Sequence, residues 1–397
     1  MPLTDTILSP ELTQPQRSFA AGVDPRHDAL LSVLLPAMER RDVRYRALQL
    51  RDGLLYGNDF VVDKKDESKL SAVFGDLRDA GFLAVQLLAL ESGARRVVFG
   101  RVANGEPETF VVDIFLRDLS SAPGSKVSRA SRVRRSTGGA TLVFLGPDGV
   151  GKTTLLRAVS KSLEAVFPEQ NIYRWRPAVF ARAPRLARLP HSKPSRSLWG
   201  SISYLFFTWL DFTSGYVLAI HSALSRSALV IFDRFYHDLL IDPKRYRFGG
   251  PIWMVRALAR IVPPRDLLFV VLDADEQTIL SRKQQLPAEE IRRQRRAYRA
   301  FAEQAPASVL VSTENPIEQC RAEALGRIFE YLSARLAERS PAWFGSTRFG
   351  SAGTKATLAV QNAARAERES PYPPTAVLVS AESLDCKTTL NSAPPQS

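Results

Sequence analysis

Residues Gly146 to Thr154 read GPDGVGKTT and lie between the apolar run TLVFL and an amphipathic helical pattern that extends to Leu163. The spacing is G-x-x-x-x-G-K-[ST], in which the glycines allow a tight loop whose backbone N–H groups face phosphate oxygens. The N-terminal end of the following helix adds positive potential. We therefore expect a phosphate-binding loop, with the phosphates held by Gly146, Gly149, Gly151, Lys152, Thr153 and Thr154.

Lys152 and Thr153 are expected to act on the nucleotide directly. Lys152 should reach the β- and γ-phosphates of ATP, and the Thr153 hydroxyl should complete the coordination of Mg²⁺. A glycine-rich turn with an accidental lysine is the alternative, and the flanking strand and helix patterns argue against it.

Three apolar runs, TLVFLG, ALVIFD and DLLFVVLD, alternate with long helical patterns after residue 139. This alternation predicts an α/β domain over residues 140–339, in which a parallel sheet is covered by helices. Its last helix is expected to have Pro316 at the first helical position and to end the fold near Arg339.

The second apolar run delivers Asp233 and Arg234 to the carboxyl end of its strand, where ligands bind in open parallel sheets. Asp233 is placed to organise Mg²⁺ through water or to orient an acceptor, and Arg234 is placed to hold an anionic group. A structural pair that only ties down a loop is the alternative. Asp273, which ends the third run, has equal claims to a functional role and to a structural one at its strand end.

An arginine-rich stretch, SRKQQLPAEEIRRQRRAYRAFA over residues 281–302, follows the third strand. As a mobile cover over the nucleotide, Arg282 and its neighbours would neutralise charge on the transferring phosphoryl group and exclude water. As a surface helix, it would hold solvated arginines partly paired with Glu289 and Glu290. Its position after a strand end favours the cover.

Residues 140–338 resemble the thymidylate kinase-like branch of the P-loop nucleoside monophosphate kinases. The resemblance is carried by GPDGVGKTT, by FDRF at Phe232 to Phe235, by LDAD at Leu272 to Asp275, and by the arginine-rich stretch. It implies ATP as the phosphoryl donor and Mg²⁺ as its metal. It also implies that Asp148 lies near the acceptor phosphate, while Asp233 and Arg234 address the acceptor side.

One difference from that family concerns the acceptor. The family commonly has Asp-Arg in its acceptor-binding helix, whereas this chain has Asp211 followed by Phe212, so we expect an acceptor other than thymidylate. Arg176 resembles a family arginine only loosely. The basic, acid-free region from residue 170 to 210 is interpreted either as a surface for a larger anionic acceptor or a membrane, or as a solvated loop.

The sequence predicts a smaller α+β domain over residues 28–119. Its motifs YGNDFVVD and VVDIF resemble those of the nucleotidyltransferase-like fold. That fold holds two metal ions with two acids two residues apart on one strand and a third on a neighbouring strand. Here Asp59 lacks such a partner, because positions 57 and 61 are Gly57 and Val61, and Asp63 lies ~13 Å along the strand. We therefore expect a non-catalytic recognition domain, with Asp59 and Asp113 able to hold at most one ion weakly; an active transferase and a mistaken resemblance are the alternatives.

The remaining segments are expected to be an N-terminal extension over residues 1–27, a basic linker over residues 120–139, and a disordered, low-complexity tail over residues 340–397. The stretch from Leu198 to Leu224 is apolar enough to suggest a membrane span, but Asp211 near its middle favours a buried helix over a membrane-contacting surface or a span. With two cysteines in 397 residues and an N-terminus unlike a signal peptide, the sequence predicts a cytoplasmic protein.

The net charge of +13 favours anionic partners. The leading interpretation is a kinase that uses ATP and Mg²⁺ to phosphorylate a small anionic acceptor, such as a nucleotide or a related phosphate ester. The alternatives are a nucleotide-controlled switch with slow ATP hydrolysis and, less favoured, a nucleic-acid-binding protein, which lacks an aromatic recognition motif. A homodimer and peripheral membrane contact are further interpretations of the partners.

Overall fold

The structure is a computed structural model that describes residues 4–5, 25–49, 58–119, 133–136, 138–179, 191, 193–264, 266–283 and 286–345. The chain divides into two compact units, Met1–Thr354 and Lys355–Ser397, and all described residues belong to the first. Most of the basic linker, the centre of the basic 170–210 region and nearly all of the predicted tail lie outside the described residues.

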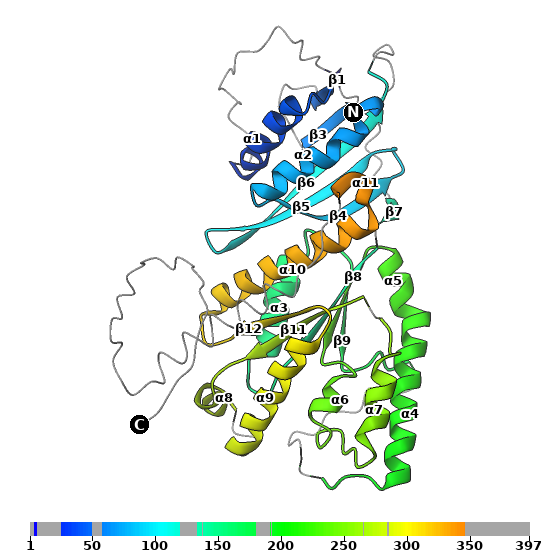
Figure 1. Ribbon diagram of the computed structural model, residues 1–397, viewed down its shortest axis with the longest axis vertical. Helices are drawn as coiled ribbons and strands as arrows, with labels where there is room; N and C mark the ends of the chain where they lie inside the picture. Colours follow the sequence, from blue (N-terminus) through cyan, green and yellow to red (C-terminus); the bar gives the residue numbers. More distant parts are fainter. Residues whose placement is uncertain are drawn as a thin grey trace, which may run out of the picture. The chain divides into compact units, whose positions relative to one another are not determined.

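A five-stranded parallel sheet carries the glycine-rich loop of residues 146–154 (Figure 1). Its strand order is β12-β11-β8-β10-β9, with β8 at Ala140–Leu145, β9 at Gln170–Arg174, β10 at Leu229–Asp233, β11 at Leu268–Asp273 and β12 at Ser308–Ser312. Every neighbouring pair is parallel, which confirms the predicted α/β sheet. Strand β8 lies between β10 and β11, and the chain continues from β8 to β9 on one side of it and from β10 to β11 on the other. The loop after β8 therefore lies near the point where the strand order reverses, which is the usual position of a ligand in such sheets.

Helices cover both faces of this sheet. They are α3 (Lys152–Ser162), α4 (Leu198–Gly215), α5 (His221–Ser225), α6 (Asp238–Ile241), α7 (Ile252–Ala259), α8 (Glu276–Arg282), α9 (Ala288–Gln304) and α10 (Ile317–Arg339). On one face, α3 and α10 share a core with the alternate residues Leu229, Ile231 and Val270. On the other face, Phe232 packs near Phe212 of α4, and Phe269 packs against Phe301 of α9.

A second, seven-stranded sheet carries the smaller α+β part. Its order is β1-β2-β3-β6-β5-β4-β7, with bounds Thr4–Asp5, Tyr45–Gln49, Asn58–Asp63, Leu83–Leu90, Arg95–Ala103, Glu106–Arg117 and Val133–Ser136 for β1 to β7. All pairs are antiparallel except β3 and β6. Helices α1 (Pro25–Arg40) and α2 (Leu70–Asp79) pack on it, with a 3-10 turn at Lys64–Lys69. Strands β1 and β7 come from the predicted extension and linker, so parts of both segments pair with the sheet.

Helix α10 joins the two parts, and Figure 1 shows it running between the sheets. It begins at Ile317, with Pro316 as its N-cap rather than its first residue, which corrects the predicted start by one position. Its Phe329 is buried, and a Cβ on Gly100 of β5 would lie 2.9 Å from the Phe329 ring. The close approach of helix and strand therefore requires glycine at position 100.

Ordered structure continues past the end predicted at Arg339. Helix α11 (Pro341–Phe344) buries Trp343 in the core of the smaller sheet, where its ring stacks on Phe74 at 6.0 Å between centroids. The Trp343 indole also donates to Glu67 Oε1 at 3.1 Å. The sequence predicts a disordered tail from residue 340 because that region is rich in Ser, Thr, Gly and Pro. The burial of Trp343 nevertheless stabilises one short helix at its start.

Replacing Trp343 with Ala should lower the free energy of unfolding by about 3–5 kcal/mol, because a buried aromatic side chain leaves a cavity. Trp253→Ala is the matched control: Trp253 is 66% exposed, and its loss should change stability by less than about 0.5 kcal/mol. Urea denaturation of both variants checks this. Equal stabilities would contradict the assignment of α11 to the folded core.

Candidate functional site

The loop between β8 and α3 has the backbone that the sequence predicts. Gly146, Gly149 and Gly151 all have positive φ angles, of 144°, 88° and 98°. At Gly146 a Cβ would lie 2.7 Å from the Leu272 carbonyl oxygen, so only glycine fits beside β11. Thr153 and Thr154 stand exposed in the first turn of α3, at the positive end of the helix.

Lys152 lies inside this loop and is 7% exposed. Its Nζ donates to the carbonyl oxygens of Gly146 at 2.7 Å and Pro147 at 2.6 Å. Burial, together with the nearby Arg234 guanidinium, lowers the pKa of Lys152 to about 7. The hydrogen-bond partners of Lys152 Nζ are these two neutral carbonyl oxygens, and the nearest carboxylate, that of Asp148, is 3.9 Å away. An anion bound beside Lys152 would raise its pKa again and favour its charged form.

Asp148, also in the loop, is clasped by two arginines. Arg234 Nη2 lies 2.5 Å from Asp148 Oδ1, Arg245 Nη1 lies 2.6 Å from Oδ2, and Lys152 Nζ is 3.9 Å away. Burial alone would raise the pKa of Asp148, but Arg234, Lys152 and Arg245 hold it well below its usual range. Three cationic groups thus surround one carboxylate beside the loop.

Arg234 is fixed by a buried polar cluster. Its Nη1 donates to Asp238 Oδ2 at 2.6 Å, and the hydroxyls of Tyr246 and Tyr298 also donate to Asp238. Arg234 has a φ of 76°, unusual for a residue with a Cβ, while its N–H donates to the Phe144 carbonyl on β8. The cluster stabilises this conformation and aims the guanidinium at Asp148.

Four residues of this cluster were not predicted as site residues from the sequence: Asp238, Arg245, Tyr246 and Tyr298. Three of them lie in YHDLLIDPKRYR, directly after the FDRF motif, and the fourth lies in the arginine-rich stretch. Their density of aromatic and charged residues next to a motif was the available signal. The local sequence does not indicate which of these side chains contact the loop, because that depends on how distant segments pack together.

The other predicted residues lie around the same edge of the sheet. Asp233 ends β10, is partly exposed, and contributes to the electrostatic field at Lys152. Arg282, at the end of α8, donates to the Thr313 carbonyl at 2.9 Å, and its Nη1 would lie 3.9 Å from a Cβ on Gly151. The predicted catalytic residues Lys152, Asp148, Asp233, Arg234 and Arg282 thus border the loop on several sides, and the structure does not test their roles.

Helix α9 is tied to the sheet by ion pairs. Arg295 binds Asp273 through Nε–Oδ1 at 2.9 Å and Nη2–Oδ2 at 3.2 Å, and Arg299 Nε donates to Asp273 Oδ2 at 2.9 Å. Asp273 therefore anchors the arginine-rich helix at the end of β11. This contact supports the structural alternative for Asp273.

Two neighbouring residues of α4, Asp211 and Phe212, are both buried. Phe212 is fully buried among Trp175, Phe232 and Phe235. Asp211 is also buried: it pairs with Arg176 at 3.1 Å and accepts from the backbone N–H of Ala178 at 2.9 Å. These two side chains hold the segment after β9 against α4.

The acids of the smaller sheet are engaged by arginines. Asp59 and Asp113 lie opposite each other on β3 and β6. Asp113, however, is bound by Arg96 through two hydrogen bonds of 2.7 and 2.8 Å, and Asp63 pairs with Arg44 at 3.0 Å. Both carboxylate oxygens of Asp113 accept hydrogen bonds from Arg96, so they are not free to coordinate a metal ion.

Comparisons with known proteins add only a weak likeness. No family model and no curated protein matches the chain. Among solved structures 184 chains match, including thymidylate kinase from Ehrlichia chaffeensis, with 18% sequence identity over 47% of this chain and 97% of that one, at a TM-score of 0.35.

Nucleotide binding at pH 8 should be accompanied by the uptake of up to about one proton. In the free protein Lys152, with its pKa of about 7, is mostly neutral at this pH, and a bound triphosphate raises that pKa and charges it. Calorimetry of ATP binding in buffers of different ionisation enthalpy measures the uptake. Lys152→Met should abolish the uptake and Lys161→Met, on the exposed side of α3, should retain it; uptake that persists in Lys152→Met would contradict the assignment.

Proposed function

We propose that the protein is an ATP- and Mg²⁺-dependent phosphotransferase that acts on a small anionic acceptor. The observation that carries this proposal is the clasp of Arg234, Arg245 and Lys152 around Asp148, directly beside a glycine loop of phosphate-binding geometry. A loop that only binds nucleotide needs no second set of cations on its acceptor side. Phosphoryl transfer needs both, because charge develops on the group that moves between donor and acceptor.

The residues of the loop fit ATP and Mg²⁺. Glycine at position 146 leaves space that a Cβ would fill, and Lys152 offers an amine without an anionic partner closer than 3.9 Å. Lys152 would bind the β- and γ-phosphates, and Thr153 with Asp233 would hold the metal directly or through water. Mg²⁺ would supply charge neutralisation between the phosphates, while Arg282 stands near Gly151 to stabilise the transferring group.

The acceptor side fits an anion held by two guanidinium groups. The two carboxylate oxygens of Asp148 accept hydrogen bonds from Arg234 and Arg245. In the complex, two oxygens of an acceptor phosphate would take their place at these guanidinium groups. The Nε of Arg245 is buried and has no hydrogen-bond partner within the described part of the chain. Arg245 is therefore a substrate-binding residue in this proposal, with a donor left for the acceptor.

Lys152→Ala should lower kcat by at least ~100-fold, since it removes one preorganised cation from the transferring phosphoryl group. Lys161→Ala, a surface change on the same helix, should leave kcat unchanged. Transfer of label from [γ-³²P]ATP to a panel of nucleotides and other phosphate esters is the measurement. ATP binding without any labelled product across the panel would favour the alternative of a nucleotide-controlled switch, and equal turnover in both variants would overturn the kinase mechanism.

Arg245→Gln should raise the KM for the acceptor by roughly 10- to 100-fold, the effect of losing a charged hydrogen bond of about 1.5–3 kcal/mol. The KM for ATP should change little. Lys244→Gln, at the exposed neighbouring position, is the control and should leave both constants unchanged. An unaltered acceptor KM in Arg245→Gln would show that the clasp only holds the loop.

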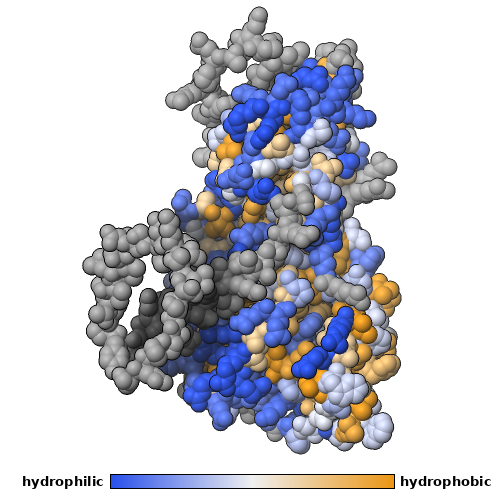
Figure 2. All heavy atoms as spheres, in the orientation of Figure 1, coloured by the Kyte–Doolittle hydropathy of each residue, from blue (hydrophilic) through white to orange (hydrophobic). Residues whose placement is uncertain are grey.

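The proposal extends to the rest of the chain. We propose that the residue 28–119 domain recognises a ligand without catalysing transfer, because Arg96 neutralises Asp113. An exposed apolar stripe on α4 and the turn that follows it would support a dimer or peripheral membrane contact, and it includes Trp199, Phe206, Leu210 and Val217. Figure 2 shows hydrophobic side chains on the surface at the side of the molecule where Figure 1 places α4. No helix among the described residues is both long and apolar enough to cross a membrane.

A further inference from the structure

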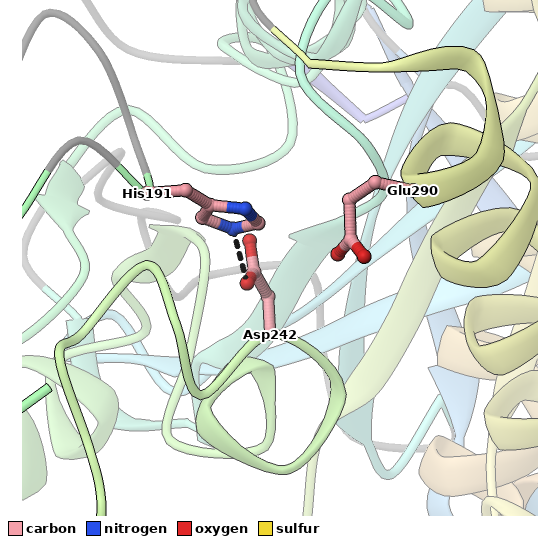
Figure 3. A group of neighbouring side chains, drawn as sticks. All are labelled: His191, Asp242 and Glu290. Carbon is pink, nitrogen blue, oxygen red and sulfur yellow. Dashed lines mark hydrogen bonds and ion pairs between the residues drawn. The ribbon is translucent and has the colours of Figure 1, made fainter. Parts of the chain in front are cut away.

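Three side chains outside the phosphate site converge from distant parts of the sequence. His191 belongs to the segment before α4, Asp242 is the C-cap of α6, and Glu290 lies in the first turn of α9. One ligand atom of each lies within 4.8 Å of those of the other two. Figure 3 shows the imidazole turned to the Asp242 carboxylate, and Glu290 pointing toward both from its helix.

We propose that His191, Asp242 and Glu290 bind a divalent transition-metal ion of the Zn²⁺ class. The proposal goes beyond the phosphotransferase and does not depend on it. One imidazole nitrogen and two carboxylates form a ligand set that such ions prefer, whereas Mg²⁺ prefers oxygen ligands and water. With three protein ligands, a water would complete a tetrahedral shell.

The charge balance of the cluster favours a cation. Asp242 is 2% exposed, so its carboxyl group is almost completely removed from water. Glu290 is paired with Arg293 through hydrogen bonds of 2.6 and 2.9 Å. A divalent cation between the two carboxylates would offset the cost of burying Asp242.

A buried glutamine already orients both carboxylates. Gln294 is 2% exposed, and its Nε2 donates to Asp242 Oδ2 at 3.1 Å and to Glu290 Oε1 at 3.1 Å. Metal-binding carboxylates commonly have such outer partners, which hold the ligands in place before the ion arrives. Neither hydrogen bond takes Asp242 Oδ1, the atom that faces His191 Nε2 at 2.7 Å.

The geometry needs small shifts for an ion to enter. Ligand atoms about 2.1 Å from a tetrahedral ion lie roughly 3.4 Å apart. The His191–Asp242 hydrogen bond of 2.7 Å must therefore widen, and the atoms up to 4.8 Å apart must approach. The bound ion would join α9 to the loop after α6, where Asp242 Oδ1 also accepts from the Arg245 backbone N–H at 3.2 Å. It would thus brace the loop that carries Arg245.

The test is a titration of the full chain with Zn²⁺ after chelator treatment, without nucleotide, followed by calorimetry. We expect one ion per chain at micromolar Zn²⁺. Binding should be lost in His191→Ala and retained in His221→Ala, which removes an exposed histidine on α5. Gln294→Ala, which keeps all three ligands, should weaken binding ~10- to 100-fold.

A second pair of variants separates lost binding from lost folding. Glu290→Gln should weaken Zn²⁺ binding, while Glu289→Gln, at the exposed neighbour, should not, and circular dichroism should show the same helix content in both. Absence of Zn²⁺ binding to the unaltered chain would overturn the proposal. Binding that survives both His191→Ala and Glu290→Gln would also overturn it, because the ion would then sit elsewhere.

Discussion

The ion-pair clasp on Asp148 is the interaction on which the rest of the site depends. The Asp148 carboxylate in the glycine-rich loop is held by Arg234 from the end of β10 and by Arg245 from the loop after α6. Breaking one side of such a buried pair leaves a charge without compensation, so the loop, β10 and the following segment are positioned together. Asp238 and its two tyrosines extend this constraint to α9 through Tyr298.

This arrangement gives a physical account of how donor and acceptor sides could communicate. Arg234 contacts the loop through Asp148, while its own position is set by Asp238, so an anion that displaces Asp148 from the arginines also alters the surroundings of Lys152. Since the pKa of Lys152 is about 7, its average charge near pH 7 responds to an anion that binds beside it. The clasp and the lysine are therefore parts of one electrostatic unit.

The sequence predicts the parallel sheet and the backbone of the glycine-rich loop well because both depend on local patterns: apolar runs of strand length, glycines at fixed spacing, and a helix that follows at once. The ends of the fold were less accessible. Strand β7 lies in a segment whose composition indicates a linker, and Trp343 anchors α11 within a region rich in Ser, Gly and Pro. Each depends on a partner far away in the chain, which local composition does not encode.

The candidate site shows the same division. Asp148 and Arg234 were both predicted as site residues, but they are 86 residues apart, and their direct contact follows only from the adjacency of β8 and β10. Arg245 lies outside the motifs of the sequence, and its contact with Asp148 follows from a fold that brings it back to the glycine-rich loop. The sequence does not show which arginines of the 281–302 stretch lie near the glycine-rich loop. In the structure Arg295 and Arg299 bind Asp273, whereas Arg282 lies near Gly151.

The most direct test of the central claim is a crystal structure with a non-hydrolysable ATP analogue and Mg²⁺. The account predicts the triphosphate inside the loop of residues 146–154, with Lys152 Nζ moved from the Gly146 and Pro147 carbonyl oxygens to the β- and γ-phosphates. A nucleotide bound elsewhere, with Lys152 still donating to both carbonyls, would contradict it.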